Sequence, residues 1–294
     1  MTPSQARAFR AVAVEGSFTA AAKALNLSQP TLTTQVNLIE KRYNVELFHR
    51  SSRGVRLTSA GTHLLSIVRR MFNSYDEAIA YLEEVHGMRR GHLRVGSYVP
   101  YDVTGMLARY NERHPGIQIS LAFANSRELA NRLLDYDIDV GIYGRLEPLD
   151  EFVSIPFSQP RLIVIAPRNA VWSDRANIRP SELAGLNIIL REAGSAAREA
   201  FERLLLEAGV VRTSYIEVGS REGVVSAVAA GMGVSAIFDE GLLPEDRIVR
   251  LAITGSAQQS YVDVVCLKER RNSLPIRSFL TIAKELSSAR QGRL

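Results

Sequence analysis

The sequence contains a single cysteine, Cys266, among its 294 residues. One thiol cannot form an internal disulfide, and it excludes a cysteine-rich metal site. The five histidines are scattered, and no pair of them has the HExxH spacing of zinc enzymes. Cys266 lies in an apolar run, where a buried packing role is far more common than redox sensing. We therefore expect no disulfide, no metal site and no cofactor.

Several other features are also absent from the sequence. No stretch approaches the roughly eighteen uninterrupted apolar residues of a membrane span, and the first fifteen residues do not resemble a signal peptide. The sequence has no GxSxG elbow and no phosphate loop ending in Gly-Lys. Residues 231–236 fit a dinucleotide fingerprint, but they follow an expected helix and precede a strand, which reverses the required order. These absences predict a cytoplasmic protein that neither contacts a membrane nor acts as an enzyme.

The positive charge of the chain is confined to its first fifth. The formal net charge is +5, and residues 1–58 hold eight of the 36 Lys/Arg but only three of the 31 Asp/Glu. The remaining residues therefore have no net charge. A basic patch on a neutral body is typical of a module that binds a polyanion, and the alternative is a basic, solvated terminus. The length is sufficient for two or three folding units.

Three helical patterns follow one another at the N-terminus. Apolar residues at helical spacing predict a first helix that ends near Gly16, and Ser17 then caps a short helix over Phe18–Leu25. After a tight turn, Ser28 caps a third helix that runs to Tyr43. The first two turns of this third helix carry uncharged polar side chains, which recognition helices present to base edges in the major groove. These side chains are Gln29, Thr31, Thr33, Thr34 and Gln35.

Residues 47–57 predict a basic two-stranded wing. Two short runs flank a polar turn with Gly54 at its tip, and Arg50, Arg53 and Arg56 are placed for phosphate or minor-groove contacts. The alternative is a small helical bundle with a polar surface. The succession of helix, tight turn, polar helix and basic hairpin favours a winged helix-turn-helix domain over residues 1–58. We expect it to bind double-stranded DNA.

The stretch from Phe9 to Gly61 resembles the N-terminal signature of LysR-type transcriptional regulators. The residues in register with that signature are Phe9, Gly16-Ser17-Phe18, Ala21-Ala22, Leu25, Ser28-Gln29-Pro30, Leu38, Glu40, Leu47-Phe48, Arg50, Leu57-Thr58 and Ala60-Gly61. The resemblance implies that the start of the third helix lines the major groove and that Arg53 serves the wing. The complete set of expected DNA-binding residues is Ser28, Gln29, Pro30, Thr31, Thr33, Thr34, Gln35, Arg50 and Arg53.

Two positions depart from the pattern of this family. Asn44 stands where the family usually has glycine, but asparagine tolerates the left-handed conformation that ends a helix. Thr34 stands where many members carry a basic residue, so one DNA contact of the family is in doubt in this chain.

Residues 59–86 predict one long helix, for which Thr58 is a suitable cap. Apolar residues recur at spacings of 4, 3, 4, 3, 4 and 3, which is an unbroken heptad seam. The seam consists of Leu64, Val68, Met71, Tyr75, Ala78, Leu82 and Val85. It favours pairing with a second chain as a homodimer or homotetramer, and the alternative is a helix packed on its own domain. The resemblance implies dimerisation through this helix, and residues 87–91 are expected to form a hinge.

From His92 onward, short β runs alternate with helices, which predicts an α/β architecture. Strands are expected at 93–96, 117–123, 140–142, 162–166, 188–190, 234–238 and 262–267, and helices at 103–113, 126–135, 196–208 and 221–230. The resemblance implies a two-lobed effector-binding domain over 92–294, like the periplasmic solute-binding proteins. The chain would cross between the lobes twice, with one lobe at 92–161 and 267–294 and the other at 162–266.

Polar residues at the strand-to-helix junctions of this region predict a site for a small-molecule effector. Hydroxyls and free backbone N–H groups at helix N-termini favour an anion. Each residue taken alone is better explained as an ordinary cap, but several of them facing one cleft favour effector binding. The expected effector-binding residues are Ser97, Tyr98, Asn125, Ser126, Ser195 and Ser220. Tyr143 and Phe238 are expected either to form walls of the cleft or to pack in the core.

Residues 125–142 resemble a subgroup associated with aminoethylphosphonate catabolism. A zwitterionic phosphonate would suit helix N-termini together with a carboxylate such as Asp102 or Asp239.

We therefore expect a sequence-specific transcriptional regulator of the LysR type that is controlled by an effector. The alternatives are a DNA-binding protein that needs no effector, a solute-binding protein and an α/β enzyme. The intact basic domain argues against the second, and the third has no supporting motif.

Overall fold

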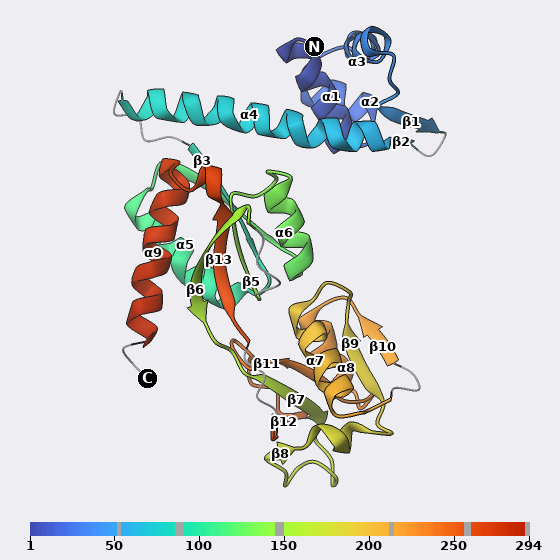
Figure 1. Cartoon of the computed structure of the whole chain (residues 1–294), viewed down its shortest axis with the longest axis vertical. Helices are drawn as coiled ribbons and strands as arrows, with labels where there is room; N and C mark the ends of the chain where they lie inside the picture. Colours follow the sequence, from blue (N-terminus) through green and yellow to red (C-terminus); the bar gives the residue numbers. More distant parts are fainter. Residues whose placement is uncertain (52–53, 86–90, 145–149, 212–214, 256–259, 292–294) are drawn as a thin grey trace. The chain divides into compact units, whose positions relative to one another are not determined.

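The computed structural model describes residues 1–51, 54–85, 91–144, 150–211, 215–255 and 260–291. The chain divides into two compact units, Met1–Met88 with Leu134–Asp137, and Arg89–Leu133 with Ile138–Leu294 (Figure 1). In the described part of the chain, no helix is both long enough and apolar enough to cross a membrane.

The N-terminal unit is a winged helix-turn-helix followed by a long helix, as predicted. Its elements are α1 (Pro3–Glu15), α2 (Phe18–Ala24), α3 (Gln29–Tyr43), β1 (Phe48–Ser51), β2 (Gly54–Leu57) and α4 (Ser59–Val85). The caps are also those predicted: the Oγ atoms of Ser17 and Ser28 accept hydrogen bonds from backbone N–H groups of the first turns of α2 and α3. Gly16 and Asn44 adopt the left-handed conformation that ends α1 and α3.

An aromatic cluster fixes the wing to the helices. β1 and β2 pair antiparallel, and the first residue of β1, Phe48, is buried. Its ring lies 5.3 Å from the ring of Phe9 in α1 and 5.9 Å from that of Phe18 in α2. Burial of such rings contributes most of the stability of a small core, so the wing is part of the folded domain.

The start of α4 packs into the same core. Leu65, Val68 and Phe72 are buried among the residues of α1–α3, while Leu64 is half-buried against them. Val68, and in part Leu64, therefore differ from the prediction, which placed both in the seam between two chains. A heptad spacing identifies an apolar stripe but not the surface that covers it. Met71 is the first residue of the predicted seam that is exposed.

Gly61 allows α4 to begin directly against the wing. The Thr58 hydroxyl caps α4 by accepting a hydrogen bond from the Gly61 N–H at 2.9 Å, and the Thr58 N–H donates to the Leu47 carbonyl at 3.0 Å. A Cβ atom on Gly61 would lie only 2.1 Å from that carbonyl oxygen. The helix can approach the chain this closely only without a side chain at position 61.

The second unit contains two lobes, and its first lobe is a five-stranded sheet covered by helices. The elements are β3 (Gly91–Ser97), α5 (Pro100–Arg113), β4 (Ile117–Phe123), α6 (Ser126–Leu134), β5 (Val140–Gly144), β6 (Phe152–Ser158), β13 (Val262–Leu267) and α9 (Leu274–Gln291). The strand order is β4-β3-β5-β13-β6, with β13 antiparallel to both of its neighbours.

Successive side chains of the central strands point to opposite faces of this sheet, and helices cover both faces. In β13, Val264 and Cys266 pack with residues of α5 and α9, whereas Val265 packs with residues of α6. This is the two-residue period of a strand buried on both sides. Cys266 is buried, as expected, and burial raises the pKa of its thiol to about 11. The thiol is therefore protonated and unreactive near neutral pH.

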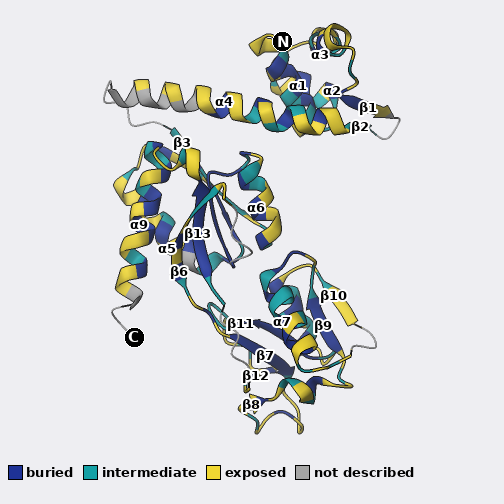
Figure 2. Cartoon of the chain, viewed as in Figure 1, coloured by how far each residue is buried: buried dark blue, intermediate teal, exposed yellow. Residues whose placement is uncertain are grey.

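The second lobe contains β7 to β12. Its elements are β7 (Leu162–Pro167), β8 (Asn177–Ile178), β9 (Ile188–Arg191), α7 (Ala196–Glu207), β10 (Tyr215–Val218), α8 (Arg221–Ala229), β11 (Ser235–Phe238) and β12 (Ile248–Ile253). One sheet has the order β11-β7-β12-β8, and β9 pairs in parallel with β10. Residues of α7 and of α8 pack in two separate apolar clusters with alternating residues of β7. Figure 2 shows the central strands β13 and β7 as buried, whereas β10 is mostly exposed.

The boundary between the lobes differs from the predicted one at its second crossing. The first crossing lies between Ser158 and Leu162, as expected. The prediction that residues 262–266 belong to the second lobe was wrong, because β13 pairs with β5 and β6 of the first lobe. The strand itself was predicted correctly, but its partners are far away in the sequence. β6, β8, β10 and β12 and the C-terminal helix α9 were not predicted as elements.

We expect Gly61→Ala to destabilise the N-terminal unit by about 1–3 kcal/mol, because the added methyl group meets a backbone carbonyl that cannot move aside cheaply. The matched control is Gly105→Ala in α5, where a Cβ would meet nothing within 4 Å. That change should instead stabilise its helix by up to about 1 kcal/mol. Hydrogen exchange at amides of α1–α3 measures the first effect. Unchanged protection in Gly61→Ala would contradict the packing argument.

Candidate functional site

The start of α3 forms an exposed polar surface on the N-terminal unit. Gln29, Pro30, Thr31 and Thr34 are exposed, and Thr33 and Gln35 are half-buried. The Gln29 Oε1 accepts a hydrogen bond from the Thr19 hydroxyl at 3.1 Å, which orients its amide from α2. The Thr34 hydroxyl donates to the Pro30 carbonyl at 2.9 Å, so its methyl group remains for contacts outside the helix.

Two further predicted DNA-binding residues have structural roles. The Ser28 Oγ accepts from the Thr31 N–H at 3.2 Å and so caps α3. Arg50 of β1 donates to Asn37 at 2.7 Å and to Glu40 at 3.1 Å, and its guanidinium lies over the Phe18 ring at 4.8 Å. Arg50 therefore ties the wing to α3, although its side chain is still 44% exposed. Arg53 lies outside the described residues.

The second unit contains a small cavity at the ends of its strands and the beginnings of its helices. Its volume is about 10 Å³, which is room for roughly one water molecule. Residues of both lobes contribute to its wall, as expected where the carboxyl ends of strands meet helix N-termini. The lining residues are Tyr98, Asn125, Ser126, Arg191, Ser195, Ala196, Ala197, Arg221, Ile237 and Phe238.

The cavity includes four of the six predicted effector-binding residues: Tyr98, Asn125, Ser126 and Ser195. Phe238, which was expected either here or in the core, also lines it. Ser97 does not, because it is buried behind the wall and its hydroxyl donates to the Val99 carbonyl at 2.6 Å.

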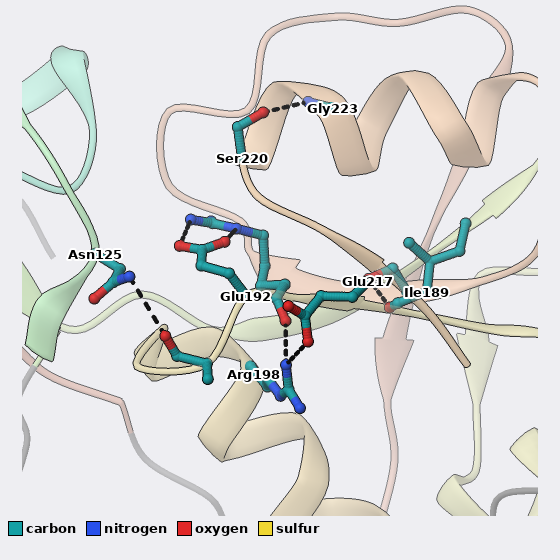
Figure 3. Close-up of polar contacts among 10 residues, drawn as sticks. Asn125, Ile189, Glu192, Arg198, Glu217, Ser220 and Gly223 are labelled. Atoms are coloured by element: carbon teal, nitrogen blue, oxygen red, sulfur yellow. Dashed lines mark hydrogen bonds and ion pairs between the residues drawn. The ribbon is translucent and has the colours of Figure 1, made fainter. Parts of the chain in front are cut away.

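Three other residues weighed from the sequence lie elsewhere. Ser220 is exposed, and its Oγ accepts from the Gly223 N–H at 3.0 Å, so it is an ordinary cap of α8 (Figure 3). Tyr143 packs in the core beside α6, where burial raises the pKa of its hydroxyl. The Asp239 carboxylate accepts hydrogen bonds from Arg161. The side chain of Asp102 lies outside the described residues.

Arg221 is the most informative residue of the cavity, and the sequence did not reveal it. It is the first residue of α8 and is only 6% exposed. Its Nη2 donates to the carbonyls of Phe238 and Glu240, both at 2.8 Å. No carboxylate in the described part of the chain forms an ion pair with it, and the electrostatic attraction of Glu222 is smaller than the effect of burial. Burial lowers the pKa of the guanidinium, which still remains charged at neutral pH.

Arg191, the last residue of β9, supplies a second cation that the sequence analysis missed. Its guanidinium forms two hydrogen bonds with the carboxylate of Glu192. Its backbone carbonyl accepts from Arg198 Nη1 at 2.8 Å, and the same nitrogen lies 2.6 Å from the Glu217 carboxylate (Figure 3). Arg198 on α7 thus fixes the end of β9 and the end of β10 together.

The backbone around the cavity also favours negative charge. Ser195 precedes α7, and its side chain does not cap the helix. Ala196 and Ala197, the first residues of α7, line the cavity, and the N–H groups at this end of the helix lack that side-chain partner. On the other lobe, Asn125 caps α6 by accepting from the Glu128 N–H at 3.0 Å. Helix N-termini and buried guanidinium groups together suit an anion.

The same region connects the two lobes. The Arg127 N–H donates to the Gly194 carbonyl at 3.2 Å, and the Arg127 side chain pairs with Glu199 at 2.7 Å. The Asn125 amide donates to the Ala193 carbonyl at 3.5 Å (Figure 3). The start of α6 therefore contacts the loop that precedes α7, beside the cavity.

Two family profiles cover most of the chain. Residues 3–62 match the bacterial regulatory helix-turn-helix proteins of the lysR family, and residues 86–288 match the LysR substrate binding domain. The chain belongs to the LysR family. It is a transcriptional regulator with an N-terminal DNA-binding domain and a C-terminal effector-binding domain, as the sequence predicted.

Similar proteins agree with this assignment. The RuBisCO operon transcriptional regulator of Allochromatium vinosum is 33% identical over 256 residues, which cover 85% of each chain. A full-length cysteine-to-aspartate variant of OxyR from Pseudomonas aeruginosa shares the fold, with a TM-score of 0.73 at 21% identity, over 97% of this chain and 94% of that one. The regulatory domain of CcmR from Synechocystis PCC6803, solved in complex with 2-PG, matches 67% of this chain and 97% of that one, with a TM-score of 0.60 at 26% identity.

Proposed function

We propose that the cavity lined by Arg191 and Arg221 binds a small anionic effector, and that this binding controls how the protein engages its operator. The observation that carries the proposal is the burial of Arg221 without a carboxylate partner among the described residues. A buried charge of this kind costs several kcal/mol unless a counter-charge accompanies it. An anionic ligand would supply that counter-charge where the helix N-termini also favour it.

The small volume of the cavity bears on how the effector would act. A space for about one water molecule cannot hold an organic anion, so binding requires the wall to move. The contacts of Asn125 and Arg127 with the opposite lobe would then have to change. A ligand that binds one arrangement of the lobes more tightly shifts the population toward it, and this gives an effector a means of control.

Operator recognition would fall to the exposed start of α3. Gln29 is held by Thr19, and a glutamine amide in the major groove pairs with the N6 and N7 atoms of adenine. The methyl group of Thr34 is suited to contact the methyl group of thymine. Arg56, exposed on β2 of the wing, is suited to a phosphate contact that carries no sequence information.

The long helix α4 would pair two chains. Its large apolar residues Ile67, Met71, Tyr75, Ile79 and Leu82 are all at least 39% exposed. An exposed apolar stripe on a 27-residue helix is a surface that a second copy can cover. Two paired helix-turn-helix domains would then bind two half-sites, as DNA-binding dimers of this kind do.

The relatives named above are regulators, and we infer that this protein regulates rather than catalyses and acts in the cytoplasm, where bacterial DNA lies. A zwitterionic phosphonate is a second candidate effector. It would need a carboxylate for its amine, however, and Asp239 is already engaged by Arg161, which favours a plain anion. A DNA-binding protein without an effector is the alternative that the first experiment below separates.

We expect Arg221→Met to weaken anion binding about tenfold or more, because hydrogen bonds to a charged group contribute about 1.5–3 kcal/mol. The matched control is Arg203→Met on the exposed side of α7, which should change affinity less than about twofold. A thermal-shift screen with sulfate, phosphate, small carboxylates and phosphonates measures these affinities, since a ligand that binds the native state stabilises it. Equal binding by Arg221→Met and the wild type would contradict the proposed site. A panel that stabilises neither protein would favour the effector-independent alternative.

We expect Gln29→Ala to weaken binding to the operator by about 1–3 kcal/mol while binding to random DNA is unchanged, because an amide–adenine pair is lost. Arg56→Ala serves as the control and should weaken binding to both DNAs alike. Fluorescence anisotropy with the promoter region of the protein's own gene gives both affinities. An equal loss on both DNAs in Gln29→Ala would exclude a role in base recognition.

We expect Met71→Glu to dissociate the oligomer into monomers, because it places a charge within the exposed apolar stripe of α4. Val14→Glu is the control, since Val14 is 61% exposed but lies on α1. Sedimentation velocity distinguishes the two states. If Met71→Glu sediments like the wild type, the stripe does not hold the chains together.

A further inference from the structure

The two arginines that line the cavity differ in their counter-charges. Arg221 has two backbone carbonyls as partners. Arg191 has a carboxylate, because Glu192 follows it directly and accepts hydrogen bonds from its Nε and Nη2, both at 2.8 Å (Figure 3). The Arg191 Nη1 makes no hydrogen bond to any residue that the structure describes. The cavity thus has two cations and one internal anion beside it.

The geometry of this pair is the one in which a guanidinium binds a ligand carboxylate. Two parallel hydrogen bonds from the same edge of an arginine are among the stronger polar contacts in proteins. Here that edge is occupied by the chain itself. The side chains of Arg191 and Glu192 are only 12% and 21% exposed, so solvent screens the pair less than a surface pair.

Glu192 is also held in place by its surroundings. Burial opposes its ionisation, but the hydrogen bond and charge of Arg191 outweigh burial, and Asn125 contributes a further hydrogen bond, so the pKa of Glu192 is lowered. The next two residues, Ala193 and Gly194, contact Asn125 and Arg127 of the opposite lobe. The carboxylate is therefore ionised at neutral pH and fixed beside the cavity.

From this arrangement we infer that Glu192 is an internal counter-ion that offsets the charge of Arg191 and so makes the cavity select effectors with one negative charge over those with two. The inference rests on the proposed function, because it requires the cavity to bind an anion. One uncompensated cation, Arg221, remains for the effector.

The selection follows from the way repulsion scales with charge. The repulsion between Glu192 and a bound anion is proportional to the charge of that anion. A dianion is therefore repelled with about twice the free energy of a monoanion at the same position. The dissociation constant depends exponentially on the free energy of binding. The factor by which Glu192 weakens binding of a dianion is therefore about the square of the factor for a monoanion.

The test compares sulfate, a dianion, with formate, a monoanion, in thermal-shift titrations of the full chain at constant ionic strength. Glu192→Gln keeps the size of the side chain and removes its charge. We expect it to tighten binding of both anions, with a fold gain for sulfate that is about the square of the gain for formate. Gains of about tenfold and hundredfold are the scale that Coulomb's law gives for charges several ångströms apart in a protein.

Two further variants separate this role from other effects. Glu207→Gln also removes a negative charge from α7, but Glu207 is exposed at the end of the helix away from the cavity, so both affinities should change less than about twofold. Glu192→Asp keeps the charge and should keep the preference for formate. If Glu192→Gln changes the two affinities by the same factor, or only as much as Glu207→Gln does, the inference is wrong.

These outcomes are distinct from failure of the proposed function. If Arg221→Met binds both anions as the wild type does, the cavity is not the effector site, and the inferred role of Glu192 is excluded as well. If Arg221→Met loses binding while Glu192→Gln behaves like Glu207→Gln, the cavity remains the effector site and only the role of Glu192 is refuted.

Discussion

The buried charge of Arg221 constrains everything around the cavity of the second unit. A guanidinium taken out of water needs acceptors for its N–H groups and a counter-charge for its cation. The end of β11 and the residues after it supply the first need through the carbonyls of Phe238 and Glu240. No carboxylate among the described residues forms an ion pair with Arg221, and the attraction of Glu222 is smaller than the effect of burial, so an anionic effector would be a suitable partner of this site. The same two carbonyls belong to the end of β11 and to the segment that leads to β12 of the same lobe.

The N-terminal unit depends on a different constraint, the close approach of α4 to the wing. Gly61 permits this approach, and Thr58 fixes it through hydrogen bonds to the residues before β1. As a result the long helix, the wing and the recognition helix share one core that includes Phe48 and Val68. A partner chain that covers the exposed stripe of α4 would therefore hold two recognition helices through rigid contacts. Arg50 and Glu40 add a polar connection between the wing and α3.

Particular residues show how far the sequence alone could be taken. Residues that cap or end a helix do so through contacts with residues close to them in the sequence. The helix boundaries predicted from such residues were confirmed at Gly16, Ser17, Ser28 and Asn44. Val68 was assigned to the wrong surface, because the spacing of apolar residues says nothing about which of two neighbours covers them. The strand Val262–Leu267 was recognised but placed in the wrong lobe, since its partners β5 and β6 precede it by more than a hundred residues. Four of the six expected effector residues line the cavity because they lie at strand ends and helix starts, where the fold class alone predicts a site.

The sequence by itself determined the local elements, the basic N-terminal module and its resemblance to a family, because caps, periodicity and charge act over a few residues. Only the tertiary structure decided which cations meet in the cavity. Arg191 and Arg221 are thirty residues apart and look like ordinary solvated arginines in the sequence. Their role follows from their burial beside one cavity. That burial exists only once the chain has crossed between the two lobes and both have folded. Whether an arginine is paired with a carboxylate, as Arg191 is with Glu192, or lacks one, as Arg221 does among the described residues, is likewise a property of the folded chain.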